Sequence, residues 1–134
     1  MVELAGLFIA AFLAATILPL ASEVPLVLLV RRDGAIFWPV AVATAGNYLG
    51  ACTTYLLARA AAARLAPAST VPTSRAAGWF HRYGAPSLLL SWVPVAGDGL
   101  VALAGATAIP FAVFSVWTAL GKAARYVVVA WLAL

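Results

Sequence analysis

The chain has 134 residues, of which 66% are hydrophobic and 9% charged, with a mean hydropathy of +1.07. A soluble domain of this size has too little interior to hide so much apolar surface, so the composition indicates an integral membrane protein. The net charge of +4 comes from scattered bases without a nucleic-acid-binding motif, which argues against a nucleic-acid partner, and the single cysteine excludes an internal disulfide.

The N-terminal part is expected to form a helical hairpin that enters the membrane without crossing it. Residues 4–18 are uniformly apolar and favour a helix, which Pro19 ends by removing a backbone donor. A polar break at residues 22–25, which contains Glu23, then precedes a short apolar stretch. A helix from Glu23 to Arg32 rises only ~15 Å, whereas the hydrocarbon core is ~30 Å thick. The sequence therefore predicts a re-entrant hairpin with Glu23 at its tip.

A full membrane span is expected at residues 36–59, which are long enough to cross. Gly46 and Gly50 have the GxxxG spacing that lets two helices approach closely, either inside the monomer or between two copies of the chain. Asn47 needs a buried partner, for which the bases of the last span are candidates. Tyr55, near the end of the span, suits a membrane interface.

The second half opens with segments of different character. Residues 60–73 form a connector rich in alanine, proline, serine and threonine. Residues 74–83 mix aromatic and basic side chains, which is typical of a helix lying at the lipid headgroups. Residues 85–92 are apolar again and begin a second hairpin.

The tip of that second hairpin is expected at residues 94–99, where a proline and two glycines surround Asp98. Glycine permits backbone conformations that other residues resist, so a break in the helix is expected here. A short return helix follows at residues 100–108. Pro110 then opens a final span at residues 111–134.

The order of long helix, broken tip, short helix, proline and full span therefore occurs twice. It predicts an all-α integral membrane protein with two re-entrant helical hairpins and two full transmembrane helices. The chain forms a single domain over residues 1–134, and its halves, about 1–66 and 74–134, are related as an inverted repeat. Four ordinary spans kinked by prolines are the alternative.

Four ionisable side chains lie in stretches that are otherwise typical of membrane: Glu23, Asp98, Lys122 and Arg125. A charge in the hydrocarbon costs ~3 kcal/mol, so an apolar chain keeps one only where it pairs, faces water or binds a ligand. Lys122 and Arg125 share a helix face, and a guanidinium suits a phosphate or a carboxylate. This charge quartet is the candidate transport site. A structural ion pair, a helix cap at Asp98 and a snorkelling Arg125 are the simpler interpretations.

Supporting roles are expected for residues that break helices or share a face with the charge quartet, namely Pro25, Asn47, Pro94, Gly97 and Tyr126. No set of histidine, cysteine and carboxylate side chains has metal-ligand spacing, and no nucleophile–base pair or phosphate loop is visible. We therefore expect no metal, no cofactor and no enzymatic activity.

Several short motifs together resemble the YqaA-type branch of the DedA family, also called SNARE-associated or VTT-domain proteins. They are Trp-Phe-His-Arg-Tyr-Gly at 79–84, Ser-Trp-Val-Pro-Val-Ala-Gly-Asp at 91–98 and Gly-Lys-Ala-Ala-Arg-Tyr at 121–126, with similar first-half motifs at 22–25 and 46–50. The resemblance implies opposed re-entrant hairpins in a bacterial inner membrane, and lipid movement tied to undecaprenyl phosphate and the proton-motive force. Glu23 matches the acid of the family's first hairpin. The second hairpin of typical members carries an arginine, where this chain has Asp98.

We therefore expect a multi-pass transporter of the inner membrane that moves an anionic, phosphate-bearing lipid, either undecaprenyl phosphate or a phospholipid. Lys122 and Arg125 would bind the phosphate. Glu23 and Asp98 would neutralise those bases when the site is empty, and one acid would exchange a proton. All four side chains should then meet on one face of the last span. An ion or small-solute carrier, and a non-transporting assembly partner or homo-oligomer packed through the GxxxG face, are the other interpretations.

Overall fold

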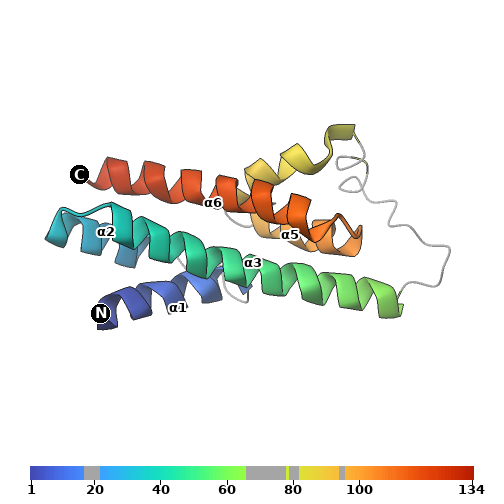
Figure 1. The fold of residues 1–134 in the computed structure, drawn as a ribbon, viewed down its shortest axis with the longest axis horizontal. Helices are drawn as coiled ribbons and strands as arrows, with labels where there is room; N and C mark the ends of the chain where they lie inside the picture. The colour runs from blue at the N-terminus through green and yellow to red at the C-terminus, as the bar shows by residue number, and fades with distance from the viewer. Residues whose placement is uncertain (17–21, 66–77, 79–81, 94–95) are drawn as a thin grey trace.

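The computed structural model describes residues 1–16, 22–65, 78, 82–93 and 96–134, and it contains helices and no strand over these residues. In chain order the helices are α1 (Val2–Thr16), α2 (Glu23–Asp33), α3 (Phe37–Leu65), the 3₁₀ helix η1 (Ala85–Trp92), α5 (Ala96–Ala106) and α6 (Phe111–Ala133). The two longest, α3 and α6, run antiparallel along the molecule, and both chain ends lie at the same end of it (Figure 1). The all-helical class expected from the sequence is confirmed.

The first two helices, α1 and α2, form a helical hairpin. With 15 residues in α1 and 11 in α2, they rise only ~22 and ~16 Å, so neither reaches across a ~30 Å hydrocarbon core. Gly34 ends α2 in a left-handed conformation (φ 64°), and its N–H donates to the Val30 carbonyl at 2.9 Å. Arg32, near the end of α2, pairs with Glu3 at the start of α1. The chain therefore comes back to the end of the molecule at which it began.

The Glu3–Arg32 pair should make this closure sensitive to acid. The Arg32 guanidinium donates hydrogen bonds to the exposed Glu3 carboxylate and holds the pKa of that carboxyl below its usual range. Because the folded-state pKa is the lower one, the contribution of the pair is complete above about pH 4.3 and is lost as the pH falls through the folded-state value. We expect the thermal midpoint of the native chain to exceed that of Glu3→Gln slightly at about pH 7, and the difference to disappear in acid, as the pH falls through the folded-state pKa. A difference that acidification does not change would contradict this assignment.

A second helical hairpin, formed by η1 and α5, lies in the other half of the chain. Figure 1 shows that it opens toward the end of the molecule opposite to the chain termini. η1 begins after Gly84, whose φ of 66° is left-handed, and the Ser87 hydroxyl donates to the Gly84 carbonyl at 2.7 Å. The apolar arm expected at residues 85–92 is confirmed in its bounds, but with eight residues it is not the long helix that the repeated order predicted. Gly84 separates the eight-residue η1 from the preceding residues, so a continuous helix cannot form there.

The short helices pack on the two long ones in a reciprocal way. α1 lies along α3 and η1 lies along α6, so each first arm packs on the long helix of its own half. α5 packs on α3, and α2 packs mainly on α6, so each second arm packs on the long helix of the other half. At the end of α6, the Ala133 carbonyl accepts a hydrogen bond of 3.3 Å from the Arg31 guanidinium of α2. The two halves are thereby interlocked.

α1 and α3 approach each other closely at two glycines of α3. A Cβ atom on Gly46 would lie 2.5 Å from the Phe8 carbonyl oxygen, and one on Gly50 would lie 2.5 Å from the Phe12 carbonyl oxygen. The backbones of the two helices are therefore in contact, as small residues permit in membrane proteins. The close approach expected from the GxxxG spacing is confirmed as packing inside the monomer.

Two apolar clusters fill the interior. The first joins α1, α2, α3 and α6 and consists of Leu7, Ala11, Leu26, Leu29, Val30, Val40, Ala43, Tyr126, Ala130 and Ala133. The second joins α3, η1, α5 and α6 and consists of Ala51, Tyr55, Leu88, Val101, Ala104 and Phe114. In the second cluster Tyr55 is fully buried, with its ring stacked on Phe114 and its hydroxyl donating to the Ile109 carbonyl. The Tyr55 hydroxyl therefore has a partner inside the protein.

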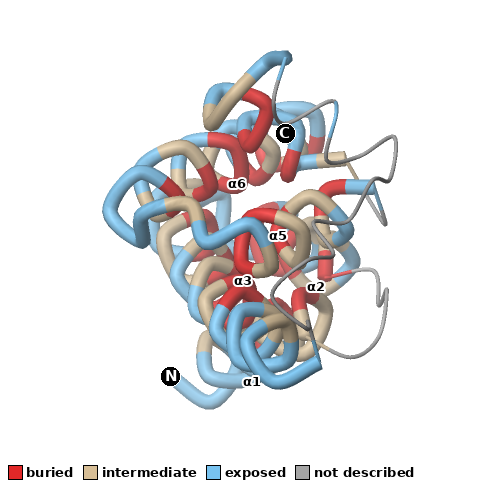
Figure 2. Tube along the Cα trace, turned by 90° about the vertical axis from the view of Figure 1, so that its right-hand side faces the viewer, coloured by how far each residue is buried: buried red, intermediate tan, exposed pale blue. Residues whose placement is uncertain are grey.

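The outer surface of the long helices is apolar. Figure 2 shows the buried stretches of α3, α5 and α6 facing one another and exposed stretches on the outside. Large hydrophobic side chains are exposed there, including Leu49 and Leu56 of α3 and Val116, Leu120, Val127 and Trp131 of α6. Water-soluble proteins rarely expose so much apolar surface, so this face fits a lipid environment. Among the helices that the structure describes, α6 is the one both long and apolar enough to cross a membrane.

Two helix boundaries differ from the sequence-based prediction. α3 continues to Leu65, well into the stretch expected as a connector, because the alanines at residues 60–63 favour a helix. α5 begins at Ala96, so Asp98 lies in its first turn and not in a break. The predicted breaks at Pro19 and Pro94, and most of the predicted headgroup helix at 74–83, lie outside the described residues.

Candidate functional site

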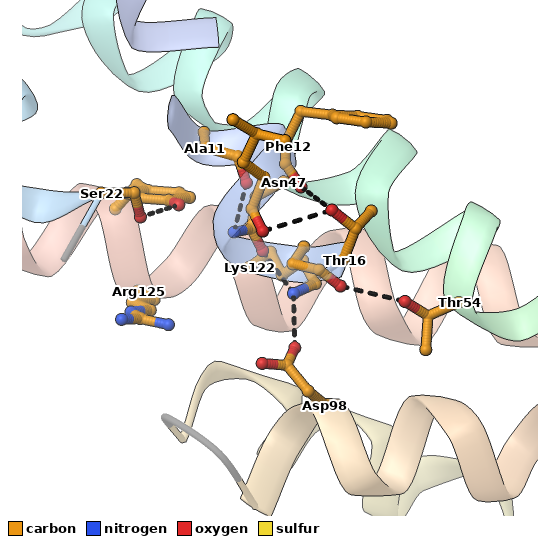
Figure 3. Close-up of polar contacts among 12 residues, drawn as sticks. Ala11, Phe12, Thr16, Ser22, Asn47, Thr54, Asp98, Lys122 and Arg125 are labelled. Carbon is orange, nitrogen blue, oxygen red and sulfur yellow. Dashed lines mark hydrogen bonds and ion pairs between the residues drawn. The ribbon is translucent and has the colours of Figure 1, made fainter. Parts of the chain in front are cut away.

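The charge quartet and its neighbours lie between the two apolar clusters. On α6, Lys122 lies between Phe114 of the second cluster and Tyr126 of the first. On α3, Asn47 has the corresponding position between the two clusters. Figure 3 shows Asn47 of α3, Asp98 of α5 and Lys122 of α6 meeting beside α1. A polar layer therefore crosses the middle of an otherwise apolar interior.

Lys122 is the most deeply buried charged group of the quartet, with a side chain that is 2% exposed. Its ammonium donates a hydrogen bond to the Asn47 side-chain oxygen. The amide nitrogen of Asn47 in turn donates to the Ala11 carbonyl of α1 at 3.0 Å, which fixes the orientation of the amide (Figure 3). Lys122 is therefore the buried partner that the sequence predicted for Asn47, and Asn47 holds Lys122 from one side.

Asp98 faces the other side of Lys122. The Asp98 Oδ1 and the Lys122 Nζ are 3.8 Å apart, which is an ion pair but is too long for a hydrogen bond. The Asp98 side chain is 38% exposed and accepts no hydrogen bond from the residues that the structure describes. Its place in the first turn of α5 suits an acid, because the helix dipole is positive there. Asp98 is thus a loosely held counter-ion of a firmly held base.

Arg125 and Glu23 form the second ion pair, and they are in direct contact. Their side chains are 17% and 26% exposed, so the pair is mostly shielded from solvent. Glu23 is in the first turn of α2, as Asp98 is in the first turn of α5. The neighbouring Tyr126 is fully buried, and its hydroxyl is 2.8 Å from the Ser22 hydroxyl just before α2. This contact and the ion pair both join the start of α2 to α6.

The structure thus brings all four charged side chains to one stretch of α6, as the sequence led us to expect. Each acid lies in the first turn of a short returning helix, and each meets one base of α6. The simpler interpretation of Arg125 as a residue that snorkels to the surface does not agree with its contact to Glu23. The interpretation of all four groups as structural ion pairs is compatible with these distances.

The residues predicted to support the charge quartet lie in different parts of the fold. Pro25 is in the first turn of α2, where proline is tolerated. Gly97 touches the Ser91 backbone so closely that a Cβ would overlap with it, which ties α5 to η1. Pro94 lies outside the described residues, and Tyr126 has the contact with Ser22 given above.

Three hydroxyls of this region were not predicted from the sequence. Ser22 binds Tyr126, while Ser91 in η1 and Thr118 in α6 are buried and have no hydrogen-bond partner. A signal for the two serines was present, because each opens a Ser-x-Val-Pro motif, at residues 22–25 and 91–94. Thr118 is four residues before Lys122 and therefore on the same face of α6.

The fold and this site define a helical membrane protein with a buried, charge-balanced polar layer. No family model and no solved structure matches the chain. It is 44% identical over 133 residues to proteins named inner membrane protein YqaA from Escherichia coli and Shigella flexneri, covering 96% of this chain and 89% of each relative. It is also 41% identical to an uncharacterized protein of Haemophilus influenzae, covering 93% of this chain and 83% of that protein.

The chain therefore belongs to the YqaA family of inner membrane proteins. The name of the relatives agrees with the composition, the apolar outer surface and the membrane-length helix α6. The YqaA part of the resemblance seen in the sequence motifs is confirmed.

Proposed function

We propose that the protein is a small transporter that moves an anionic, phosphate-bearing lipid between the leaflets of the inner membrane, and that it is not an enzyme. One observation carries the proposal. Two acids, each at the start of a short returning helix, meet two bases on one face of α6 between the apolar clusters. Charges in such a layer are costly, so they are retained where they serve a ligand or an ion.

The proposed architecture has two re-entrant hairpins, α1–α2 and η1–α5, and two full spans, α3 and α6, as the inverted repeat that resembles the DedA family. The four short helices are each too short to cross a ~30 Å core. The two hairpins open toward opposite ends of the molecule (Figure 1). The reciprocal packing of the arms on α3 and α6 is what a two-fold relation between halves requires. These features support one domain with halves of about 1–66 and 74–134 and a site at the midplane.

In the proposed mechanism the lipid phosphate competes with the two carboxylates for the two bases. Arg125 offers a planar guanidinium that can bind two phosphate oxygens at once, and Lys122 adds a second positive charge. Glu23 and Asp98 neutralise these bases when no lipid is bound. When the phosphate replaces Glu23, which is less exposed than Asp98, the Glu23 carboxylate takes up a proton instead of remaining unpaired in a medium of low dielectric, which couples transport to protons.

The test measures transbilayer movement of a labelled isoprenyl phosphate and a labelled phospholipid in liposomes containing the purified protein, with and without a pH gradient. We expect Arg125→Ala to slow movement about 100-fold, because it removes a charge-assisted contact to the phosphate worth up to ~3 kcal/mol. Glu23→Gln should abolish movement for a different reason, because an amide can neither neutralise Arg125 in the empty protein nor exchange a proton. Arg32→Ala is the matched control, since Arg32 pairs with an exposed acid far from the charge quartet, and it should transport normally.

Normal lipid movement in a folded Arg125→Ala protein would contradict the proposal. No movement of either lipid by the folded native chain would favour an ion or small-solute carrier with Glu23 as its cation or proton site. An assembly role through the GxxxG face has less support, because α1 covers Gly46 and Gly50.

A further inference from the structure

Two buried hydroxyls in the middle of the molecule lack partners. The Ser91 Oγ of η1 and the Thr118 Oγ1 of α6 are inaccessible to solvent and form no hydrogen bond. Buried polar groups in native proteins are nearly always paired, so an unpaired one calls for a physical reason. A third such hydroxyl, that of Thr44, belongs to a residue that is only half-buried.

Both residues lie in the part of the fold that holds the Lys122–Asp98 pair. The Ser91 Oγ is 3.0 Å from the position that a Cβ would take on Gly121, the residue before Lys122. The Ser91 backbone also abuts Gly97, the residue before Asp98. Thr118 is one helical turn before Lys122 on the same face of α6. Ser91 therefore packs against the residue before each member of the ion pair, and Thr118 extends the polar face of α6 by one turn.

These groups supply the kind of donors that an oxyanion needs. An ammonium has three donor protons, and Asn47 accepts one from Lys122. Asp98, at 3.8 Å, accepts none of the others. The two hydroxyls each have a donor proton without an acceptor. Among the described residues, Lys122, Ser91 and Thr118 thus have donor protons in excess of acceptors.

We propose that Ser91, Thr118 and Lys122 form a subsite for a phosphate oxyanion and that Asp98 is the group which the phosphate displaces. The subsite rests on the proposed function, because it names what binds at Lys122. Asn47 keeps the ammonium in place, while the half-exposed Asp98 carboxylate turns toward water. The phosphate then accepts hydrogen bonds from both hydroxyls and from the ammonium. Arg125, in direct contact with Glu23, remains paired at this stage.

The test uses variants that remove a hydroxyl and keep the shape of the side chain. Ser91→Ala and Thr118→Val should each weaken binding of inorganic phosphate about tenfold, because each removes a hydrogen bond to a charged ligand. Their thermal midpoints should be unchanged or raised, since the hydroxyls have no partner in the empty protein. Lys122 is the only lysine of the chain, so a ¹³C label at lysine Cε gives one NMR signal with which to follow the titration.

Ser115→Ala is the matched control. Ser115 is also on α6, and its hydroxyl is 2.7 Å from that of Tyr48, so its loss removes an existing contact. This variant should have a lower thermal midpoint and an unchanged affinity for phosphate. The expected effects on stability and on binding are therefore opposite for the control and the two subsite variants.

The same titrations with phosphatidate in phosphatidylcholine nanodiscs separate lipid phosphate from free phosphate. Weaker binding of inorganic phosphate in both hydroxyl variants supports the subsite, even if no lipid is transported and the proposed function fails. Unchanged affinity for inorganic phosphate and phosphatidate in Ser91→Ala and Thr118→Val overturns the subsite, even if lipid transport is observed. A lower thermal midpoint in both hydroxyl variants also overturns it, because the hydroxyls would then have partners in the empty protein.

Discussion

Replacing Gly46 by leucine is expected to separate α1 from α3 and to lower the free energy of unfolding by about 3 kcal/mol or more, at the upper end of overpacking effects. The Phe8 carbonyl oxygen is 2.5 Å from the position of a Cβ on Gly46, so even the first added carbon overlaps with backbone. A backbone carbonyl of α1 cannot move aside without displacing its helix. The hydrogen bond from Asn47 to the Ala11 carbonyl, one turn further along α1, would be lost with it.

Gly6→Leu is the control for this experiment. Gly6 is on α1 itself and has open space where its Cβ would be, so the same substitution should be neutral or slightly stabilising through helix propensity. Thermal unfolding in detergent, followed by circular dichroism, measures both variants. Equal midpoints for Gly46→Leu and Gly6→Leu would show that α1 does not pack on this face. A face so occupied within the monomer is also unsuited to homodimer formation.

Helix ends were predicted correctly from the sequence where a single residue determines the local backbone geometry. Gly34 marks the C-terminal end of α2, and Pro110 marks the start of α6. Gly97 and Gly99 were interpreted as breakers by the same rule, yet both are helical in α5. Gly97 is needed there because Ser91 is in contact with it, and a packing requirement of that kind has no local signal.

The candidate site was likewise predictable from the sequence only in part. The cost of a charge in hydrocarbon identifies Glu23, Asp98, Lys122 and Arg125 from the sequence alone. Which acid meets which base depends on how α2 and α5 pack on α6, and this follows from tertiary structure. The hydroxyl of Ser91 could not be placed for a further reason. η1 is a 3₁₀ helix, and its three-residue turn directs other side chains toward α6 than an α-helix would.

Asp98→Asn is expected to destabilise the empty protein by about 2 kcal/mol. Two charges 4 Å apart attract by ~4 kcal/mol at the effective dielectric constant of protein sites, and the exposure of Asp98 reduces this value by about half. This loss of stability is large for the substitution of an accessible acid. The reason is that Lys122, the base left unpaired, is 2% exposed and cannot reach water. The opposite change, Lys122→Met, should cost less, since the remaining Asp98 is already hydrated.

Inorganic phosphate should restore the stability that the protein loses in Asp98→Asn. In the variant, the carboxylate that competes with phosphate for Lys122 is absent, so affinity should rise, and a ligand present at 100 times its dissociation constant stabilises the native state by ~2.7 kcal/mol. The measurement is the thermal midpoint with and without inorganic phosphate. Asp33→Asn is the control, because Asp33 pairs with the exposed Arg32 and its midpoint should not respond to phosphate differently from that of the native chain. If the thermal midpoint of Asp98→Asn is lowered equally with and without phosphate, Asp98 is a fixed structural partner of Lys122. If phosphate restores the midpoint, Asp98 occupies the place of the anion in the empty protein. This response to phosphate distinguishes a binding site from a buried ion pair.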